Sequence, residues 1–204
     1  MSTATIPGDS FLESARIDPA QAALLIVDVQ EKLSAVMPAA TMAACERNIH
    51  VLVELAKRLR WPILWSEQYP KGLGPTLPAL HTALADLQTS DPSAVTRIEK
   101  MTFACTDDDV FLSAHARLQK QHYVVTGMEA HICVWQTVRG LRALGSNVFL
   151  PRDAVISRTS ENHHVGLELA RAAGAVVTST ETVAFDALRR AGTDDFRAIS
   201  RLIK

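Results

Sequence analysis

The feature that most constrains the fold is a regular alternation of short apolar runs with longer stretches of helical period. The apolar runs are rich in β-branched residues, as in strands that are buried on both faces of a parallel sheet. The stretches between them carry apolar residues three and four positions apart, which is typical of amphipathic helices. The alternation predicts an α/β fold in which helices join parallel strands. Six strands are expected, at Ala22–Val27, Pro62–Ser66, Ala94–Ile98, His122–Thr126, Asn147–Leu150 and Ala175–Thr178.

The pattern predicts a doubly wound six-stranded parallel sheet of order 3-2-1-4-5-6, with helices on both faces in a three-layer α/β/α arrangement. A Pro- and Gly-rich segment after the second strand, Glu67–Pro78, is expected to be irregular, and long loops of this kind are often functional. Helices are predicted at Thr41–Leu59, Asp108–Gln119, Cys133–Leu144 and Glu161–Ala173, then from Thr182 with Thr180 as N-cap, and at Asp194–Leu202.

Length and composition indicate one globular domain. The chain has 204 residues, of which 48% are hydrophobic, and single cores commonly reach this size. We expect an N-terminal arm over residues 1–21 and a single domain over residues 22–204. The arm has no basic segment leading into an apolar stretch, as a secretion signal would.

Charge and cysteine content argue against several classes of partner. With 21 basic and 22 acidic residues the net charge is −1, and without a basic run a nucleic acid or anionic lipid partner is not expected. No apolar run approaches the roughly 20 residues of a membrane-spanning helix. Three cysteines without a C-x-x-C pair argue against disulfides and structural zinc. These observations predict a cytoplasmic protein with reduced thiols and a small-molecule substrate.

The predicted strand order brings two distant reactive groups together. Ligands of doubly wound sheets bind beyond the carboxyl ends of the strands where the winding reverses. Strands one and four are neighbours there, so Asp28 should face the segment 127–133, which ends at Cys133. Lys100 follows a strand two places away, roughly 10 Å at the usual strand spacing, so its long side chain must cover the gap.

Cys133 is the strongest candidate nucleophile. It lies at the predicted start of a helix after a Gly-containing turn, where backbone amides and the helix dipole stabilise a thiolate. Asp28 could remove and return the thiol proton, and Lys100 could favour the ionised forms. The plainer alternatives are a buried cysteine, an aspartate that caps a turn, and a solvated lysine.

Three stretches, LLIVDVQEKL at 24–33, EKMTFAC at 99–105 and VVTGMEAHICVWQT at 124–137, resemble the motifs of the isochorismatase-like cysteine hydrolases, in that family's order. The resemblance runs from about Ala22 to Leu188. The segment EQYPKGLGPT at 67–76 is similar in particular to the branch of isochorismatase-domain proteins and YcaC-related hydrolases.

The resemblance implies a catalytic triad of Asp28, Lys100 and Cys133. It also implies a cis peptide bond between Met128 and Glu129, an oxyanion hole formed by the backbone amides of Glu129 and Cys133, and self-assembly into a homo-oligomer. The implied reaction is hydrolysis of a small amide or related acyl compound through an acyl-enzyme, at a C–N bond other than a peptide bond. No cofactor is expected.

Two alternatives stay open. One is cleavage of a vinyl ether, as in true isochorismatases, with Asp28 as the acid and no need for the thiol. The other is an oligomeric interaction protein that has kept the motifs without turnover. Related nicotinamidases hold a metal with an aspartate and histidines after the second strand, whereas this chain reads Glu67-Gln68-Tyr69-Pro70 there, so no metal is predicted.

The substrate pocket is expected to be partly apolar, because such sites combine apolar walls with few polar anchors. Arg158, after the fifth strand, is the one arginine that we expect could approach it. His131 invites a Cys–His dyad, and Cys105 could be a second thiol near the pocket, but a histidine turned away and a packed cysteine are favoured. Asp107–Asp109 is interpreted as a helix cap rather than a metal site. The predicted pocket residues are Tyr69, Leu73, Phe103, Ile132 and Trp135.

Overall fold

The structure, a computed structural model, describes residues 15–204. Most of the predicted N-terminal arm, residues 1–14, therefore lies outside the described residues. The last part of the arm packs on the domain: Ile17 is buried and its amide donates to Asp186 Oδ2 at 2.7 Å. A short 3-10 turn, Pro19–Gln21, then leads into the first strand.

A parallel sheet forms the centre of the molecule. Its strand order is β3-β2-β1-β4-β5-β7, with the short strand β6 beside β4. The predicted order of six strands is confirmed, with β7 as the sixth; the two-residue strand β6 was not predicted. The strands are β1 (Ala22–Val27), β2 (Ile63–Gln68), β3 (Val95–Lys100), β4 (His122–Met128), β5 (Asn147–Pro151), β6 (Val155–Ile156) and β7 (Val176–Thr178).

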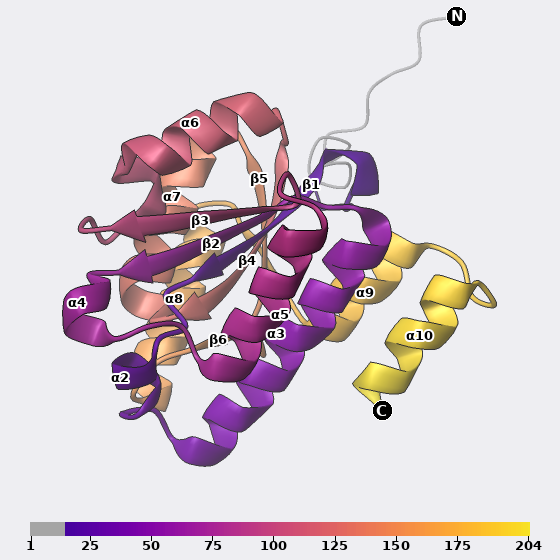
Figure 1. Cartoon of the computed structure of the whole chain (residues 1–204). Coiled ribbons are helices and arrows are strands. Elements are labelled where there is room, and N and C mark those ends of the chain that lie inside the picture. The colour runs from indigo at the N-terminus through magenta and orange to yellow at the C-terminus, as the bar shows by residue number, and fades with distance from the viewer. Residues whose placement is uncertain (1–14) are drawn as a thin grey trace, which may run out of the picture.

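Helices cover both faces of the sheet, as predicted (Figure 1). One face is covered by α3 (Ala39–Leu59), α5 (Pro78–Ser90) and α9 (Thr180–Leu188), and the other by α6 (Asp109–Leu118), α7 (Trp135–Ala143) and α8 (Ser160–Ala172). A last helix, α10 (Asp194–Ile203), packs outside α3 and α9. Two single-turn helices, α2 (Glu31–Ser34) and α4 (Pro70–Leu73), lie in the segments that follow β1 and β2.

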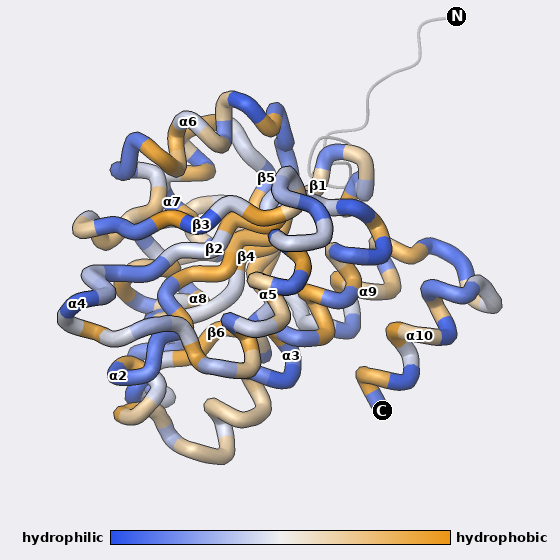
Figure 2. Tube along the Cα trace, in the orientation of Figure 1, coloured by the Kyte–Doolittle hydropathy of each residue, from blue (hydrophilic) through white to orange (hydrophobic). Residues whose placement is uncertain are grey.

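Strand β1 is apolar along its whole length because each of its faces packs on a layer of helices. In β1, Leu24 and Ile26 belong to the core beneath α3, whereas Leu25 and Val27 belong to the core beneath α7. Figure 2 shows the same arrangement as a continuous hydrophobic centre surrounded by mixed helices. The buried polar residues Asp28, Gln68 and Lys100 stand at or directly after the carboxyl ends of β1, β2 and β3, which is where the site lies.

Several local predictions need correction. Helix α5 was not predicted, although Leu80 and Leu84, both fully buried, have helical spacing. Helix α9 begins at Thr180, and its N-cap is Ser179 instead of Thr180. The predicted helix cap at 107–109 is confirmed, since the Asp108 side chain accepts from the first-turn amides of α6.

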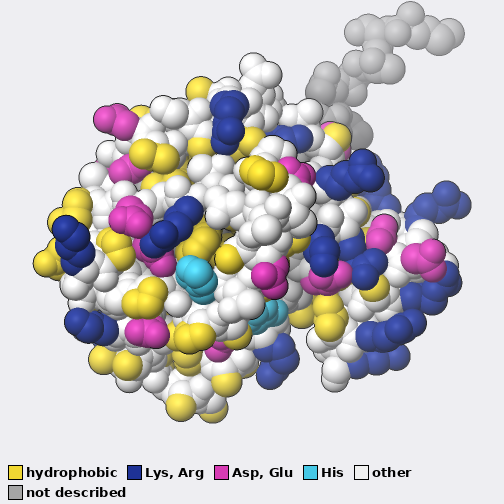
Figure 3. All heavy atoms as spheres, in the orientation of Figure 1, with side chains coloured by type: hydrophobic (Ala, Val, Ile, Leu, Met, Phe, Trp, Pro, Cys, Tyr) yellow, Lys and Arg dark blue, Asp and Glu magenta, His cyan; other side chains and the backbone are white. Residues whose placement is uncertain are grey.

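Charges of both signs are interspersed over most of the face drawn in Figure 3, with basic side chains gathered around α10. Within residues 15–204, no helix is both long and apolar enough to cross a bilayer.

Candidate active site

Asp28 lies directly after β1, at the point where the winding of the sheet reverses. It is fully buried and has a left-handed backbone, with φ at 52°. Strand β4 runs beside β1, with Gly127 opposite Val27. Gly127 has φ at 106°, and a Cβ there would collide with the Val27 carbonyl, so a glycine is needed for β4 to approach β1 this closely. The backbone thus brings the end of β4 beside Asp28.

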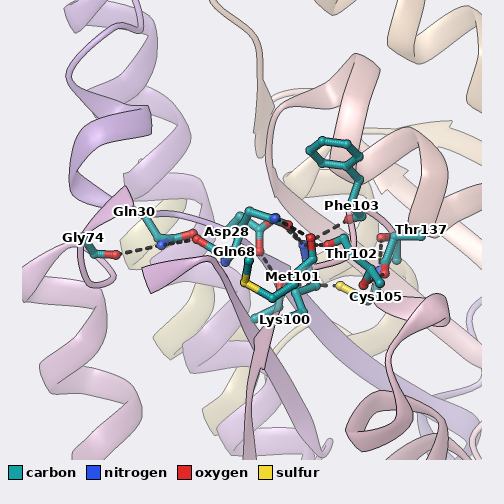
Figure 4. A network of polar contacts seen from close by, with 12 residues as sticks. Asp28, Gln30, Gln68, Gly74, Lys100, Met101, Thr102, Phe103, Cys105 and Thr137 are labelled. Carbon is teal, nitrogen blue, oxygen red and sulfur yellow. Dashed lines mark hydrogen bonds and ion pairs between the residues drawn. The ribbon is translucent and has the colours of Figure 1, made fainter. Parts of the chain in front are cut away.

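Lys100 ends β3 and reaches across β2 to Asp28. Its Nζ donates to Asp28 Oδ2 at 2.7 Å, and both side chains are fully buried. Gln68, which is paired with Lys100 across the β2–β3 register, accepts from Nζ at 2.8 Å. The carbonyls of Thr102 and Phe103 accept at 3.1 and 3.0 Å. Figure 4 shows this ring of acceptors.

The electrostatics of the site keep Lys100 charged. Burial alone would lower the pKa of its ammonium, but the negative charge of Asp28 and its hydrogen bond to the ammonium raise the pKa overall. A charged lysine with four acceptors is a fixed positive group. The alternative that Lys100 is a solvated surface lysine is therefore wrong.

Cys133 lies in a single π-helical turn, Ala130–Val134, between β4 and α7. The predicted helix start at Cys133 is therefore wrong, and α7 begins two residues later. The peptide bond between Met128 and Glu129 is cis. Helix α8 packs directly on this turn. The contact at Gly166 is so close that a Cβ there would collide with the backbone of Ala130 and His131. The turn is thus held between a strand and a helix.

Burial and the charge of Asp28 favour the neutral form of the Cys133 thiol. Burial raises its pKa, and the Asp28 carboxylate raises it further by charge and by a side-chain hydrogen bond, whereas Lys100 lowers it. The residue is 6% exposed. Stabilisation of a thiolate by the amides of this turn stays a prediction, and in this surrounding ionisation requires transfer of the thiol proton.

A second thiol joins the site through a serine. Ser66 donates to Asp28 Oδ1 at 2.7 Å, and the Cys105 thiol donates to Ser66 Oγ at 3.5 Å. Cys105 is fully buried, and burial together with the charge of Asp28 raises its pKa to about 11. Cys105 is therefore a neutral, packed thiol, as favoured from sequence, but one that contacts the network of Asp28.

The segment between β2 and α5 is pinned to the sheet. Glu67 is fully buried, and its Oε1 accepts from the Thr76 amide and hydroxyl, each at 2.7 Å. Its Oε2 accepts from Arg97 Nε at 3.0 Å. Burial would raise the pKa of Glu67, but the hydrogen bonds from Arg97 and Thr76 lower it overall. The segment predicted to be irregular is thus fixed and contains α4.

The five predicted pocket residues occupy different surroundings. Tyr69 is 47% and Phe103 55% exposed; the Tyr69 ring lies over Gly72 of its own turn. Ile132 is half-buried and packs on the core beneath α7. Trp135, half-buried at the start of α7, lies under the Arg139 guanidinium at 5.9 Å. Leu73, the last residue of α4, is half-buried.

The remaining polar groups of the Cys133 turn have partners of their own. Glu129 Oε2 accepts from the amide and Nε of Arg158, at 3.1 and 3.0 Å. His131 Nδ1 is hydrogen-bonded to Ser157 Oγ at 3.0 Å, which agrees with a histidine engaged elsewhere and not in a dyad with Cys133.

The family of the chain follows from comparison with known proteins. The model of the isochorismatase domain matches residues 22–182. The chain belongs to the isochorismatase family. The match begins at β1 and continues to the start of α9, so it includes Asp28, Lys100 and Cys133.

Several isochorismatase-family proteins are similar over nearly the whole chain. A secreted isochorismatase effector, Isc1, of Phytophthora sojae is 31% identical over 93% of this chain and 87% of its own length. A Caenorhabditis elegans structure described as the MAR1 ribonuclease is 29% identical, covers 92% of each chain and superposes with a TM-score of 0.80. The Escherichia coli YcaC structure, described as an octameric hydrolase of unknown specificity, is 21% identical, covers 92% of this chain and 90% of its own, and has a TM-score of 0.81; at that identity it shows the shared fold.

The end of β2 carries a glutamate and a glutamine, Glu67 and Gln68. Within residues 15–204, no group of three or more His, Cys, Asp or Glu side chains could hold a metal ion. The two buried glutamines near the triad, Gln30 and Gln68, were missed from sequence as functional candidates. Their signal was position: each stands at a strand end beside a motif residue.

Proposed function

We propose that this chain is a cysteine hydrolase that cleaves small amides or related acyl compounds through an acyl-enzyme on Cys133. The observation that carries the proposal is the buried Asp28–Lys100 pair at 2.7 Å beside the Cys133 thiol. The Asp28 carboxylate lies close enough to the thiol to raise its pKa and is therefore in place to take its proton, and a fixed ammonium stabilises the negative sulfur that results. Membership of a hydrolase family supports the same reaction class.

The proposed cycle uses Asp28 as a proton carrier. Asp28 takes the thiol proton as Cys133 Sγ attacks the carbonyl carbon, which gives a tetrahedral oxyanion. The protonated Asp28 then donates to the leaving nitrogen, the C–N bond breaks, and a thioester and a free amine result. Water attacks the thioester and gives a proton to Asp28, the C–S bond breaks to release the acid, and Asp28 returns a proton to sulfur.

The oxyanion is assigned to the backbone amides of Glu129 and Cys133. Two other amides of the turn are already used, since Ile132 and Val134 both donate to the Glu129 carbonyl, at 3.0 and 3.2 Å. Arg158 holds the Glu129 side chain and so helps to fix the peptide that carries one oxyanion donor.

The proposed substrate is small and partly apolar. Cys133 is 6% exposed, which leaves little room for a bulky group beside its thiol. Met101 and Phe103, one and three residues after Lys100, are 70% and 55% exposed, so large apolar side chains lie beside the site. An acyl group with a short apolar chain suits this arrangement.

The test is a mass measurement on the intact protein during turnover of a panel of small primary amides, ureides and esters. We expect a thioester adduct on the wild type and none on Cys133→Ala, together with loss of hydrolysis. Cys45→Ala is the matched control, because Cys45 is a buried thiol in α3, outside the site; it should keep both the adduct and the activity.

Other outcomes separate the alternatives. Full hydrolysis by Cys133→Ala, with loss in Asp28→Asn, would refute the covalent route and favour acid-catalysed vinyl ether cleavage. No adduct with any substrate and an alkylation rate of Cys133 equal to that of a free thiol would favour an interaction protein without turnover. A single-stranded RNA added to the panel tests the activity named for the C. elegans relative, and its cleavage in place of amides would refute the proposal.

Self-assembly into a homo-oligomer is supported by the octameric E. coli relative and stays a proposal for this chain. Its cytoplasmic location likewise stays a prediction, and the P. sojae relative is described as secreted.

A further inference from the structure

Two buried glutamines surround the catalytic lysine without belonging to the triad. Gln68 ends β2, is 8% exposed, and accepts from Lys100 Nζ through Oε1 at 2.8 Å. Gln30, two residues after Asp28, is fully buried. Figure 4 shows both side chains in line with Asp28 and Lys100. Buried amides must satisfy four hydrogen-bonding positions, so their bonds define what they hold.

The amide of Gln68 can have only one orientation. Its Nε2 donates to the Met101 carbonyl at 2.9 Å, and this bond requires the nitrogen to face the segment after β3. Oε1 must then face the Lys100 ammonium. A fixed acceptor at this place directs one N–H of Lys100 and leaves another for Asp28.

Gln30 connects this arrangement to the segment after β2. Its Oε1 accepts from the backbone N–H of Gln68 at 2.7 Å, and its Nε2 donates to the backbone carbonyls of Gln68 and Gly74, at 3.0 and 2.7 Å. An isolated bridge pairs Gln30 with Thr76. One side chain thus joins the end of β2, the segment Tyr69–Thr76 beside the site, and the chain directly after Asp28.

The charge of the site explains why amides stand at these positions. Lys100 has one carboxylate partner, Asp28. A carboxylate at 68 would draw the ammonium away from Asp28 and place a second negative charge near the Cys133 sulfur, which would disfavour its ionisation. An amide supplies the same acceptor without the charge.

We propose that Gln68 is a positioning residue that orients the Lys100 ammonium toward Asp28, and that Gln30 links this orientation to the segment Tyr69–Thr76. The proposal rests on the proposed function of Cys133. It adds that the reactivity of the thiol depends on two neutral side chains that never touch the substrate.

The experiment measures the rate of Cys133 alkylation by iodoacetamide against pH, by mass spectrometry of the Cys133 peptide. Gln68→Met removes the acceptor but keeps the length of the side chain, and we expect alkylation about tenfold slower than in the wild type, because a hydrogen bond to a charged group is lost. Gln68→Glu keeps an acceptor and adds a charge. Its alkylation profile should shift to higher pH.

The matched control is Gln88→Met, which removes a half-buried glutamine amide of α5 whose contact with the Val95 carbonyl is 3.4 Å long. It should leave the profile unchanged. A merely structural Gln68 would lower the melting temperature without changing the rate or pH dependence of alkylation, and that result would overturn the proposal. If Gln68→Met does not fold, the profile of Gln68→Glu decides alone.

The link through Gln30 is tested with Gln30→Met and the double variant. If the two glutamines act as a unit, the double variant should be no slower than about the slower single variant. If the slowing of alkylation in the double variant equals the product of the two single effects, the link is overturned. Failure of the proposed function is seen separately, as a wild type that forms no thioester; failure of the present proposal is seen as equal alkylation of wild type and Gln68→Met.

Discussion

Asp28 and Lys100 form an ion pair with no exposed side-chain surface on either partner. Removing two charges from water is costly, and their attraction offsets this cost only when further hydrogen bonds satisfy the remaining positions. Here Ser66 satisfies the second carboxylate oxygen, and Gln68 with two carbonyls satisfies the ammonium. Both members of the ion pair therefore have a full set of hydrogen-bond partners. This suits the proposed site, in which the two charges act on a third group, the Cys133 thiol.

Lys100→Met should destabilise the protein, because it leaves Asp28 buried without its counter-charge. Breaking a buried pair by removal of one partner costs about 3–5 kcal/mol. We therefore expect the free energy of unfolding in urea to fall by about 3 kcal/mol and the reactivity of Cys133 to fall with it. Lys71→Met changes an exposed lysine of α4 and should cost less than about 0.5 kcal/mol; an equally small loss in Lys100→Met would contradict this account.

At the scale of residues, the sequence predicted which groups meet but not how they are held. Asp28 and Cys133 could be placed together because the order of parallel strands determines which strand ends are neighbours. The partners of Lys100 could not be predicted, since three of its four acceptors are an amide side chain and two carbonyls, whose orientation depends on tertiary contacts.

The segment between β2 and α5 behaves as an element in its own right. Its first residue, Tyr69, donates to the Lys100 carbonyl at 2.9 Å, and its second half is held by Glu67 at Thr76 and by Gln30 at Gly74. Trp65 Nε1 also donates to Thr76 Oγ1, at 2.7 Å. A segment anchored in this way loses little conformational entropy when a substrate binds beside it.

Glu67→Gln should loosen this segment in a pH-dependent way. The native pKa of Glu67 lies below its usual value of 4.5, so the carboxylate contributes stability that is fully present above pH 4.5 and is lost as the pH falls through the lower native pKa. We expect Glu67→Gln to cost about 2 kcal/mol near neutral pH and progressively less below pH 4.5.

The measurement is urea unfolding of both proteins at about pH 7 and about pH 3.5. Glu99→Gln provides the control, because Glu99 also pairs with Arg97 but its side chain is 56% exposed, so its effect should be small at either pH. A difference between wild type and Glu67→Gln that stays constant down to the lower pH would show that the carboxylate does not pin the segment by its charge.

At the scale of elements, strands were easier to predict than helices. All six predicted strands exist, and those at the centre of the sheet were the easiest to predict, because burial on both faces gives a largely apolar run such as β1; β3, with three charged residues, has a weaker pattern. Helix α5 was hidden by Pro78, which reads as part of the Pro-rich segment, although proline is favoured in the first turn of a helix. The π-helical turn around Cys133 could not be predicted, since no residue pattern separates such a turn from the start of an α-helix.

The candidate site and the last helix lie on opposite faces of the sheet. The side chains of Ser66, Cys105 and Cys133 lie on the α7 side of the sheet, at the carboxyl ends of the strands, whereas α10 packs on α3 and α9 outside the opposite face. The matched family region ends at residue 182, before α10 begins. The last helix can therefore contribute to the core without contacting the site.

Ile199→Ala tests this separation. Ile199 is a fully buried residue of α10 that belongs to the core cluster of α3 and α9, and truncating a buried isoleucine costs about 2–5 kcal/mol. We expect the midpoint of urea unfolding to fall while the alkylation profile of Cys133 below that midpoint stays that of the wild type. Leu202→Ala, on the same helix at 47% exposure, should change neither. A changed profile in a folded Ile199→Ala protein would mean that the layer beneath α10 transmits strain through the sheet to the triad, and the two faces would then have to be treated as one packing unit.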